Sequence, residues 1–303
     1  MKVVFFSESQ VNGKVPRDFP NARTEYAWMM ALDAPHYNIN NIPSEKFDLG
    51  IVIIPKNNPN IDLDSFRSCC DKVAVMQEGP HWYFQDYSVE QQFQYFNTLM
   101  DADWVYCHNE SDVNYYLGLG CKDVRVMRSL MIPEGFVPRS EWGNGTIIGG
   151  NFVSWYGGFD SYMVAREIGN PIWAPSMGRK QDQEDMIEDI KYMAYMSWRE
   201  WITALGQFNI GIHLMRTHAA GTFAMNCGFH GIPCIGYKGL DTQEILHPLT
   251  TVEVGDLDGA KRIADKLRNN EKFYNLCSET ISKRFSTYYD ETSWLINWKE
   301  TNE

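Results

Sequence analysis

The chain has 303 residues, and its 27 Lys and Arg against 39 Asp and Glu give a formal net charge of −12 at pH 7. A composition of 44% hydrophobic and 22% charged residues excludes disorder as the dominant state. The negative net charge argues against a protein that binds nucleic acid through its overall electrostatic potential, although a local basic cleft would still permit such binding. No run approaches the roughly 18 apolar residues of a membrane span, so we expect a cytoplasmic protein with no membrane span.

The seven cysteines are scattered along the chain without the spacing of a metal site. Free thiols that pack as small buried hydrophobic side chains fit this pattern best.

Short apolar runs alternate with helical patterns through the first half of the chain, which is typical of stacked β-α units around a parallel sheet. We expect strands at 2–6, 49–55, 72–77, 104–107 and 124–127, and helices at 24–32, 89–100 and 110–117.

The pattern begins again after a turn-rich stretch at 133–145. Strands are expected at 146–150, 171–174, 210–214, 233–237 and 251–254, and helices at 161–168, 184–189, 198–206, 221–229, 259–269 and 271–284. Two series of β-α units predict an α/β protein with two doubly wound, Rossmann-like domains that face each other across a cleft. We place an acceptor-side domain at 1–140, a donor-binding domain at 141–286, and a C-terminal helix at 287–303 that packs back on the body through Trp294 and Trp298.

The most informative segment runs from Gly211 to Glu244 and reads strand, loop, helix, turn, strand, loop. Gly221 and Thr222 open its helix, so unpaired backbone N–H groups and the positive end of the helix dipole suit a diphosphate. Gly231-Ile232-Pro233 ends the helix and begins the next strand.

This segment resembles the donor-binding half of GT-B glycosyltransferases, and Gly231-Ile232-Pro233 anchors the match. The two glutamates of the family's E-x7-E pattern fall on His218 and Asn226, so neither carboxylate is kept. In relatives the first contacts the sugar and the second holds the ribose. The resemblance implies a nucleotide-diphosphate sugar as donor, with UDP-sugar preferred, and no separate cofactor.

Further donor-binding candidates come from the same resemblance. Gly150 matches a glycine that lets the donor phosphates approach, and the loop after the strand at 233–237 offers Lys238, Asp241 and Glu244 to the sugar. Arg179 and Arg216 are the candidates to neutralise the diphosphate, with solvated surface charges as the alternative reading. Asp62-Leu63-Asp64 reads as a helix start rather than a metal motif, so we expect no metal requirement.

In the first half, the densest functional loop follows the strand at 72–77. Glu78 or His81 is the candidate general base for an acceptor hydroxyl, and Trp82 and Tyr83 are candidates to stack on a sugar or a nucleobase, or else pack in the core. Arg23 and His108 are further acceptor-binding candidates. Both an inverting enzyme with such a base and a retaining enzyme without a protein nucleophile fit the sequence.

We therefore predict a hexosyl- or pentosyltransferase that moves a sugar from a nucleotide donor to an acceptor hydroxyl. The first half resembles, more loosely, phage-encoded glycosyltransferases that modify hydroxymethylated bases in DNA, so hydroxymethylcytosine-containing DNA is one acceptor and the host cytoplasm the matching location. The alternatives are a transferase acting on a glycan or small molecule, a sugar-nucleotide epimerase, and a non-catalytic sugar-nucleotide-binding protein. Nothing in the sequence selects an oligomeric state.

Overall fold

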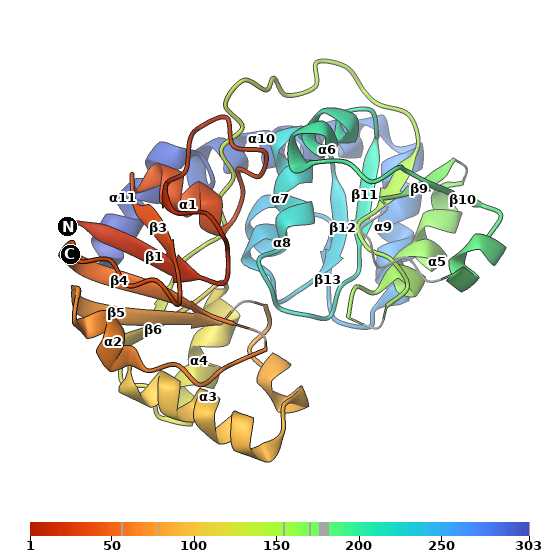
Figure 1. Cartoon of the computed structure of the whole chain (residues 1–303). Helices are drawn as coiled ribbons and strands as arrows, with labels where there is room; N and C mark the ends of the chain where they lie inside the picture. The colour runs from red at the N-terminus through yellow and green to blue at the C-terminus, as the bar shows by residue number, and fades with distance from the viewer. Residues whose placement is uncertain (56, 78, 154, 170, 176–181, 303) are drawn as a thin grey trace. The chain divides into compact units, whose positions relative to one another are not determined.

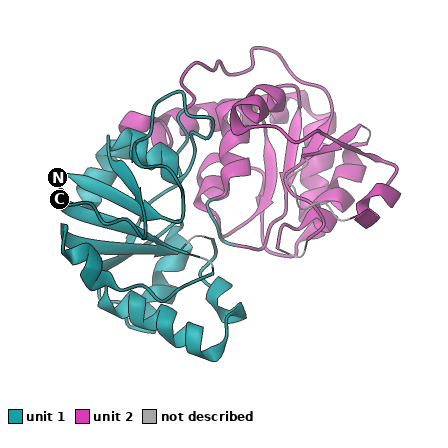
Figure 2. Cartoon of the chain, in the orientation of Figure 1, with its two compact units in different colours: residues 1–132, 218–220, 294–303 teal, residues 133–217, 221–293 magenta. Residues whose placement is uncertain are grey.

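The computed structural model describes residues 1–303 except 56, 78, 154, 170, 176–181 and 303. Contacts divide the chain into two compact units, shown in Figure 2. Unit 1 comprises Met1–Ile132, His218–Ala220 and Trp294–Glu303, and unit 2 comprises Pro133–Thr217 and Gly221–Ser293. The short segment 218–220 therefore packs with unit 1 although the chain on both sides of it belongs to unit 2.

Unit 1 is built on a seven-stranded sheet with the order β2-β3-β1-β4-β5-β6-β7, in which only the β2–β3 pair is antiparallel (Figure 1). The strands are β1 (Val3–Ser7), β2 (Gly13–Lys14), β3 (Pro35–Asn38), β4 (Phe47–Ile54), β5 (Cys70–Gln77), β6 (Trp104–Cys107) and β7 (Val124–Val126). Its helices are α1 (Glu25–Ala31), α2 (Leu63–Arg67), α3 (Val89–Asp101), α4 (Glu110–Leu119) and α11 (Glu291–Asn302), with a 3₁₀ turn at Tyr83–Asp86.

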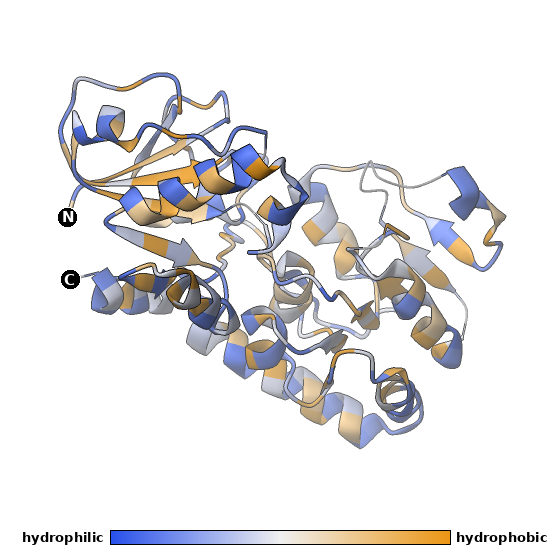
Figure 3. Ribbon diagram, turned by 90° about the horizontal axis from the view of Figure 1, so that it is seen from below, coloured by the Kyte–Doolittle hydropathy of each residue, from blue (hydrophilic) through white to orange (hydrophobic). Residues whose placement is uncertain are grey.

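The sheet of unit 1 forms because its central strands are continuous apolar runs. Every residue of β1 is buried, as are seven of the eight residues of β4, since a parallel sheet is covered on both faces. Phe6 of β1 packs edge-on against Phe66 of α2, with ring centroids 4.7 Å apart. Figure 3 shows the resulting pattern, with hydrophobic residues concentrated on strands and alternating with polar residues along the helices.

Unit 2 is built on a six-stranded, all-parallel sheet with the order β10-β9-β8-β11-β12-β13. The strands are β8 (Thr146–Ile148), β9 (Ile172–Ala174), β10 (Ile190–Tyr192), β11 (Ile210–His213), β12 (Cys234–Tyr237) and β13 (Thr251–Val252). The helices are α5 (Gly158–Ile168), α6 (Trp198–Leu205), α7 (Thr222–Phe229), α8 (Asp241–Leu246), α9 (Leu257–Asn269) and α10 (Glu271–Tyr288), with a 3₁₀ helix at Asp182–Met186. Two parallel α/β sheets confirm the predicted fold class.

Several elements differ from the sequence prediction. The strands β2, β3 and β10 and the 3₁₀ turn at Tyr83–Asp86 were not expected, and the helix expected at 184–189 is a 3₁₀ helix at Asp182–Met186. The stretch expected as a loop after the strand at 233–237 contains α8, so Asp241 and Glu244 lie on a helix. These short polar segments take their structure from neighbours: β3, for example, pairs with β1 on one side and β2 on the other.

The C-terminal helix α11 groups with unit 1 from Trp294 onward, while α10 continues to Tyr288 within unit 2. Trp294 and Trp298 are 3% and 6% exposed, and their rings stack with centroids 6.5 Å apart. The Nε1–H of Trp294 donates a hydrogen bond to the carbonyl of Arg128, at 2.9 Å. Burial of this indole pair ties the last helix to the first half of the chain.

None of the seven cysteines forms a disulfide and all are buried, in line with their expected packing role. Asp62 caps α2, where its carboxylate accepts a hydrogen bond from the N–H of Asp64, at 3.1 Å. This confirms Asp62-Leu63-Asp64 as a helix start. Among the described residues, no helix combines the length and apolar character needed to cross a membrane.

Candidate functional site

The strand order of unit 2 locates its ligand-binding edge. The order reverses between β8 and β11, because successive strands run outward from β8 to β10 on one side and from β11 to β13 on the other. Open parallel sheets bind ligands at the carboxyl ends of the strands beside such a reversal. The segments that follow β8 and β11 are therefore the candidate donor-binding segments.

Two glycines follow β8 because no side chain fits there. A Cβ on Gly149 would lie 2.6 Å from Cγ of His213, and a Cβ on Gly150 would lie 2.7 Å from Cβ of Tyr156. Packing within unit 2 is thus sufficient to require glycine at 150. The expected approach of donor phosphates to Gly150 stays a prediction.

Helix α7 begins as the sequence predicted, with Gly221 as its N-cap and Thr222 as its first residue. Gly221 has φ +62°, and a Cβ there would lie 2.0 Å from Oγ1 of Thr242. That hydroxyl donates a hydrogen bond to the carbonyl of Gly221, at 2.9 Å. The N-terminus of α7 has no acidic residue in its first turn and is fixed by this contact with α8. Helix N-termini of this kind favour anions.

Several buried polar atoms of unit 2 have no hydrogen-bond partner among the described residues. They include Oδ1 of Asn226, both amide atoms of Asn151, and Nε2 of His213. Asn151 follows Gly150 directly, and His213 ends β11, so two of these residues lie at the ligand-binding edge. Burial lowers the pKa of His213 to about 4, which keeps its imidazole neutral. Buried polar groups of this kind are normally satisfied by water or by a ligand.

Arg216 lies at the same edge and forms an ion pair with Asp160 in the first turn of α5, at 3.2 Å. Asp160 also accepts a hydrogen bond from the hydroxyl of Tyr237, at 3.1 Å. Burial and the neighbouring Asp160 raise the pKa of Tyr237 to about 12. The guanidinium is 61% exposed, so it remains accessible to an anionic ligand despite its ion pair.

The three candidates after β12 have protein partners. Lys238 pairs with Glu253, and the carboxylate of Glu244 accepts a hydrogen bond from the N–H of Gly239, at 2.8 Å. Asp241 is the first residue of α8, where a negative charge favours the helix N-terminus. The prediction of a loop is therefore wrong from Asp241 onward, because Asp241 and Glu244 lie on α8. The role of these residues toward a sugar stays a prediction.

Two predicted site residues, Glu78 and Arg179, lie outside the described residues.

In unit 1, three side chains converge that the sequence places far apart. Nδ1 of His81 lies 3.1 Å from Oδ1 of Asp112, and Nδ1 of His218 lies 3.3 Å from the same oxygen. His81 follows β5, Asp112 lies in the first turn of α4, and His218 belongs to the segment 218–220. We call these three residues the His-Asp-His cluster.

The carboxylate at the centre of this cluster is buried and ionised. Asp112 is 3% exposed, and its Oδ2 accepts a hydrogen bond from the side-chain amide of Asn109, at 3.0 Å. Burial by itself would raise the pKa of Asp112, but hydrogen bonds from His218, His81 and Asn109 outweigh it and hold the pKa well below its usual range. A negative charge therefore orients both imidazoles through Nδ1.

The segment 218–220 is held by further contacts within unit 1. The amide of Asn109 donates to the carbonyl of Ala219, at 3.2 Å, and Ser129 donates to the carbonyl of Ala220. His218 was predicted to bind the donor, and the structure instead brings it to His81 and Asp112. Its role toward a donor remains a prediction.

The His-Asp-His cluster allows two kinds of chemistry. A carboxylate that receives the Nδ1–H of His81 leaves Nε2 as a proton acceptor, which is the arrangement of an oriented general base. The same three ligand atoms lie within 4.8 Å of one another, so the set could also hold a divalent metal ion. His81 is further fixed by Tyr115, whose ring centroid lies 4.2 Å from that of the imidazole.

The remaining acceptor-side candidates are at least partly buried. Trp82 and Tyr83 are half-buried at the 3₁₀ turn, and the Tyr83 ring lies edge-on to Tyr87, with centroids 5.9 Å apart. His108 is 8% exposed, with its ring centroid 5.6 Å from that of Trp28. Nε of Arg23 donates to Oδ1 of Asn21, at 3.1 Å. His108 therefore packs in the interior rather than presenting an open acceptor surface.

Sequence reasoning missed Asp112 and Asn109. The only available signal was their position after the strand at 104–107, where Asn109 precedes α4 and Asp112 occupies its first turn. An acidic residue at this position is usually explained by the helix dipole, so its contacts with His81 and His218 could not be foreseen.

No protein-family model matches the chain, and no curated protein matches it. Several solved structures do match the chain. The chain aligns with TarM of S. aureus, crystallised with UDP, at a TM-score of 0.65 and 11% identity over 86% of this chain. It spans just over half of that protein, 57% of its length.

Two other solved structures match over almost the full length of both chains. Sucrose-phosphate synthase from Thermosynechococcus elongatus aligns at a TM-score of 0.71 and 10% identity over 99% of this chain and 98% of the other. Anabaena HepE in complex with UDP-glucose aligns at a TM-score of 0.68 and 10% identity over 99% of each chain. With its two parallel-sheet α/β units and these structural neighbours, the chain has the GT-B fold.

Proposed function

We propose that this chain is a glycosyltransferase that transfers a sugar from a UDP-sugar donor to an acceptor hydroxyl. The observation that carries the proposal is the end-to-end match to a GT-B structure with UDP-glucose bound. The reversal of strand order in unit 2 and the N-terminus of α7 support the proposal, because both features suit a diphosphate.

The donor is assigned to unit 2. Backbone N–H groups at the start of α7 and the exposed guanidinium of Arg216 together offer positive potential to a diphosphate. Asn226, whose buried Oδ1 has no partner among the described residues, accepts a hydrogen bond from a hydroxyl of the donor in this proposal. Positive potential here lowers the barrier, because the UDP leaving group gains negative charge as the glycosidic bond breaks.

His81 is proposed as the general base. Its Nε2 takes the proton of the acceptor hydroxyl while the acceptor oxygen bonds to the anomeric carbon, and the bond from that carbon to the diphosphate oxygen breaks with its electron pair leaving on UDP. Asp112 orients the ring through Nδ1 and stabilises the imidazolium that forms. Asp112 is thus a positioning residue, and Asn109 supports it in turn.

The acceptor class is the finer part of the proposal. Hydroxymethylcytosine in DNA and a glycan hydroxyl both provide the attacking group. The net charge of −12 and the partial burial of Trp82 and Tyr83 favour a glycan. DNA and glycan acceptors should therefore be compared in the same assay.

The test is UDP release from UDP-glucose, UDP-galactose and UDP-N-acetylglucosamine, with and without hydroxymethylcytosine DNA, oligosaccharides or simple alcohols. We expect acceptor-dependent release that His81→Gln abolishes. His218→Gln is the matched variant, because it removes the other imidazole from Asp112 while leaving the proposed base. It should raise KM for the donor more than it lowers kcat.

Each alternative has its own result. Conversion of the UDP-sugar to an isomer without any acceptor would identify an epimerase. Binding of the UDP-sugar with neither transfer nor isomerisation, across all acceptors, would identify a non-catalytic binding protein. Full activity in His81→Gln would refute the assignment of the base.

A further inference from the structure

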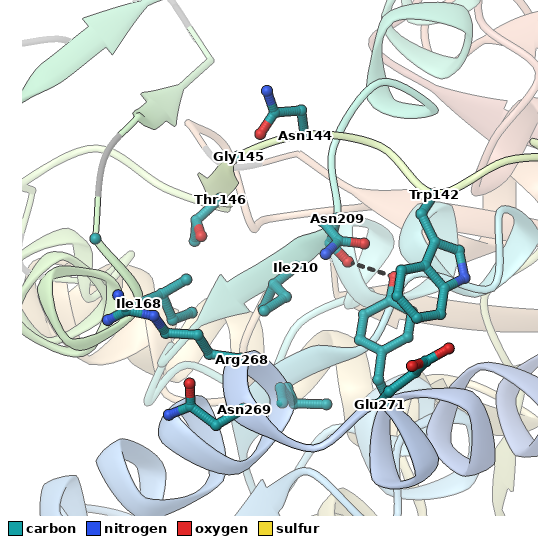
Figure 4. A pocket seen from close by; sticks show the side chains of 13 residues that line it. Trp142, Asn144, Gly145, Thr146, Ile168, Asn209, Ile210, Arg268, Asn269 and Glu271 are labelled. Carbon is teal, nitrogen blue, oxygen red and sulfur yellow. Dashed lines mark hydrogen bonds between the residues drawn. The ribbon is translucent and has the colours of Figure 1, made fainter.

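Unit 2 contains a cavity away from its proposed donor-binding edge. Thr146 and Ile210, which line it, are the first residues of β8 and β11, so the cavity opens at the amino ends of the strands whose carboxyl ends face the proposed donor. Its volume is about 350 Å³, within the usual range for small-molecule sites. Figure 4 shows the cavity between the start of β8, the end of α9 and the start of α10.

One wall of the cavity is an aromatic platform formed by Trp142, which packs against Tyr274. Trp142 is 52% exposed, and its ring lies against that of the buried Tyr274, with centroids 4.6 Å apart. The hydroxyl of Tyr274 donates to the carbonyl of Asn209, at 2.9 Å, and accepts from Nη2 of Arg139, at 2.6 Å. Tyr274 is therefore fixed by two hydrogen bonds, and it supports the half-exposed indole of Trp142, whose plane is tilted by 51° to the tyrosine ring.

The rest of the lining provides hydrogen-bonding groups of both kinds. Thr146 is 1% exposed, and its Oγ1 has no partner among the described residues, nor has Oδ1 of Asn209. Arg268 and Glu271 add one cation and one exposed carboxylate to the lining. Both residues line the cavity, and buried polar atoms of this kind are normally satisfied by a ligand or by water.

We propose that this cavity binds one neutral sugar residue of a glycan, separately from the donor. A sugar ring offers C–H groups to an aromatic face and hydroxyls that both donate and accept, which the Trp142 platform and the mixed polar lining match. Charges of opposite sign within the lining give no net attraction for a phosphate or another anion. The choice of a glycan rests on the proposed function, because a transferase with a glycan acceptor binds that glycan more tightly when a second site contacts it.

The test is calorimetric titration of the full-length protein with maltotriose, cellotriose and chitotriose, without nucleotide. We expect at least one trisaccharide to bind, and Trp142→Ala and Glu271→Gln each to weaken it by about tenfold. Tyr195→Ala is the matched control, because Tyr195 is a 79% exposed aromatic residue of unit 2 outside the cavity. It should leave trisaccharide affinity unchanged.

UDP-glucose titrated into the same proteins separates this inference from the proposed function. Trp142→Ala should bind UDP-glucose as the wild type does. If UDP-glucose binds but no trisaccharide does, or if trisaccharide affinity survives both cavity substitutions, the sugar site is refuted while the transferase proposal stands. If neither the trisaccharides nor UDP-glucose bind, both the sugar site and the transferase proposal are refuted. Uridine binding that Trp142→Ala abolishes would overturn the sugar assignment in favour of a nucleobase.

Discussion

Replacement of Asp112 by Asn tests whether one ionised carboxylate holds the His-Asp-His cluster together. The carboxylate accepts hydrogen bonds from His81, His218 and Asn109. Hydrogen bonds to a charged group contribute about 1.5–3 kcal/mol each and neutral ones about 0.5–1.5 kcal/mol, so three bonds lose roughly 3 kcal/mol. The neutral Asn side chain avoids the desolvation penalty of a buried charge, and this gain offsets part of the loss. The net loss in the free energy of unfolding is then about 1–3 kcal/mol at pH 7.

The pH dependence of this loss has a definite sign. The folded pKa of Asp112 lies below its unfolded value, so its contribution to stability is complete above the unfolded pKa of about 3.9 and is lost as the pH falls through the folded pKa. The difference in the free energy of unfolding between wild type and Asp112→Asn should therefore be constant from pH 6 to 7 and shrink below about pH 4.

Urea denaturation at pH 7, 6, 5 and 3 measures this difference. Glu110→Gln is the control, because Glu110 lies in the same helical turn but is 63% exposed, and its substitution should scarcely change stability. In the transferase assay, Asp112→Asn should lower kcat by about 10²–10⁴ if Asp112 orients a catalytic imidazole. Unchanged stability at pH 7, or a difference that grows as the pH falls from 6 to 3, would refute the reasoning.

Three other predictions concern the donor site, the C-terminal helix and metal. Gly221→Ala places a Cβ against Thr242 at a left-handed backbone position. It should therefore destabilise the fold by at least about 1–2 kcal/mol and weaken UDP binding. Wild-type UDP affinity measured by calorimetry would contradict this prediction. Trp294→Ala removes a buried indole and should cost about 3–5 kcal/mol in urea denaturation, whereas a loss under 1 kcal/mol would show that α11 contributes little. Dialysis against EDTA should leave transfer unchanged, since His81 acts as a base; if activity falls and zinc restores it with one ion per chain, the cluster is a metal site.

The sequence predicted those parts of the fold that depend on local pattern. Apolar runs such as the one in β1 mark buried strands, and Gly221 marks the start of α7 because only glycine suits its backbone angle. The polar strand β3, by contrast, exists because β1 offers it a partner, and a four-residue polar run carries no such information. The same holds for α8, whose six residues read as a loop.

The candidate site was predictable only in part, for a related reason. His81 was identified from its place after a strand, but its partner Asp112 lies 31 residues further along the chain, and His218 lies 106 residues beyond Asp112. Only the tertiary structure brings these residues together. The grouping of segment 218–220 with unit 1 follows from contacts made by Asn109 and Ser129, which no periodicity or motif encodes.

The most direct test of the account is calorimetric titration of the full-length protein with UDP, UDP-glucose, ADP and GDP. We predict saturable binding of UDP and UDP-glucose, one molecule per chain, with preference over ADP and GDP, and weaker binding of both ligands by Gly221→Ala. Absence of saturable heat with every nucleotide at millimolar concentration would contradict the central claim that this GT-B chain uses a UDP-sugar.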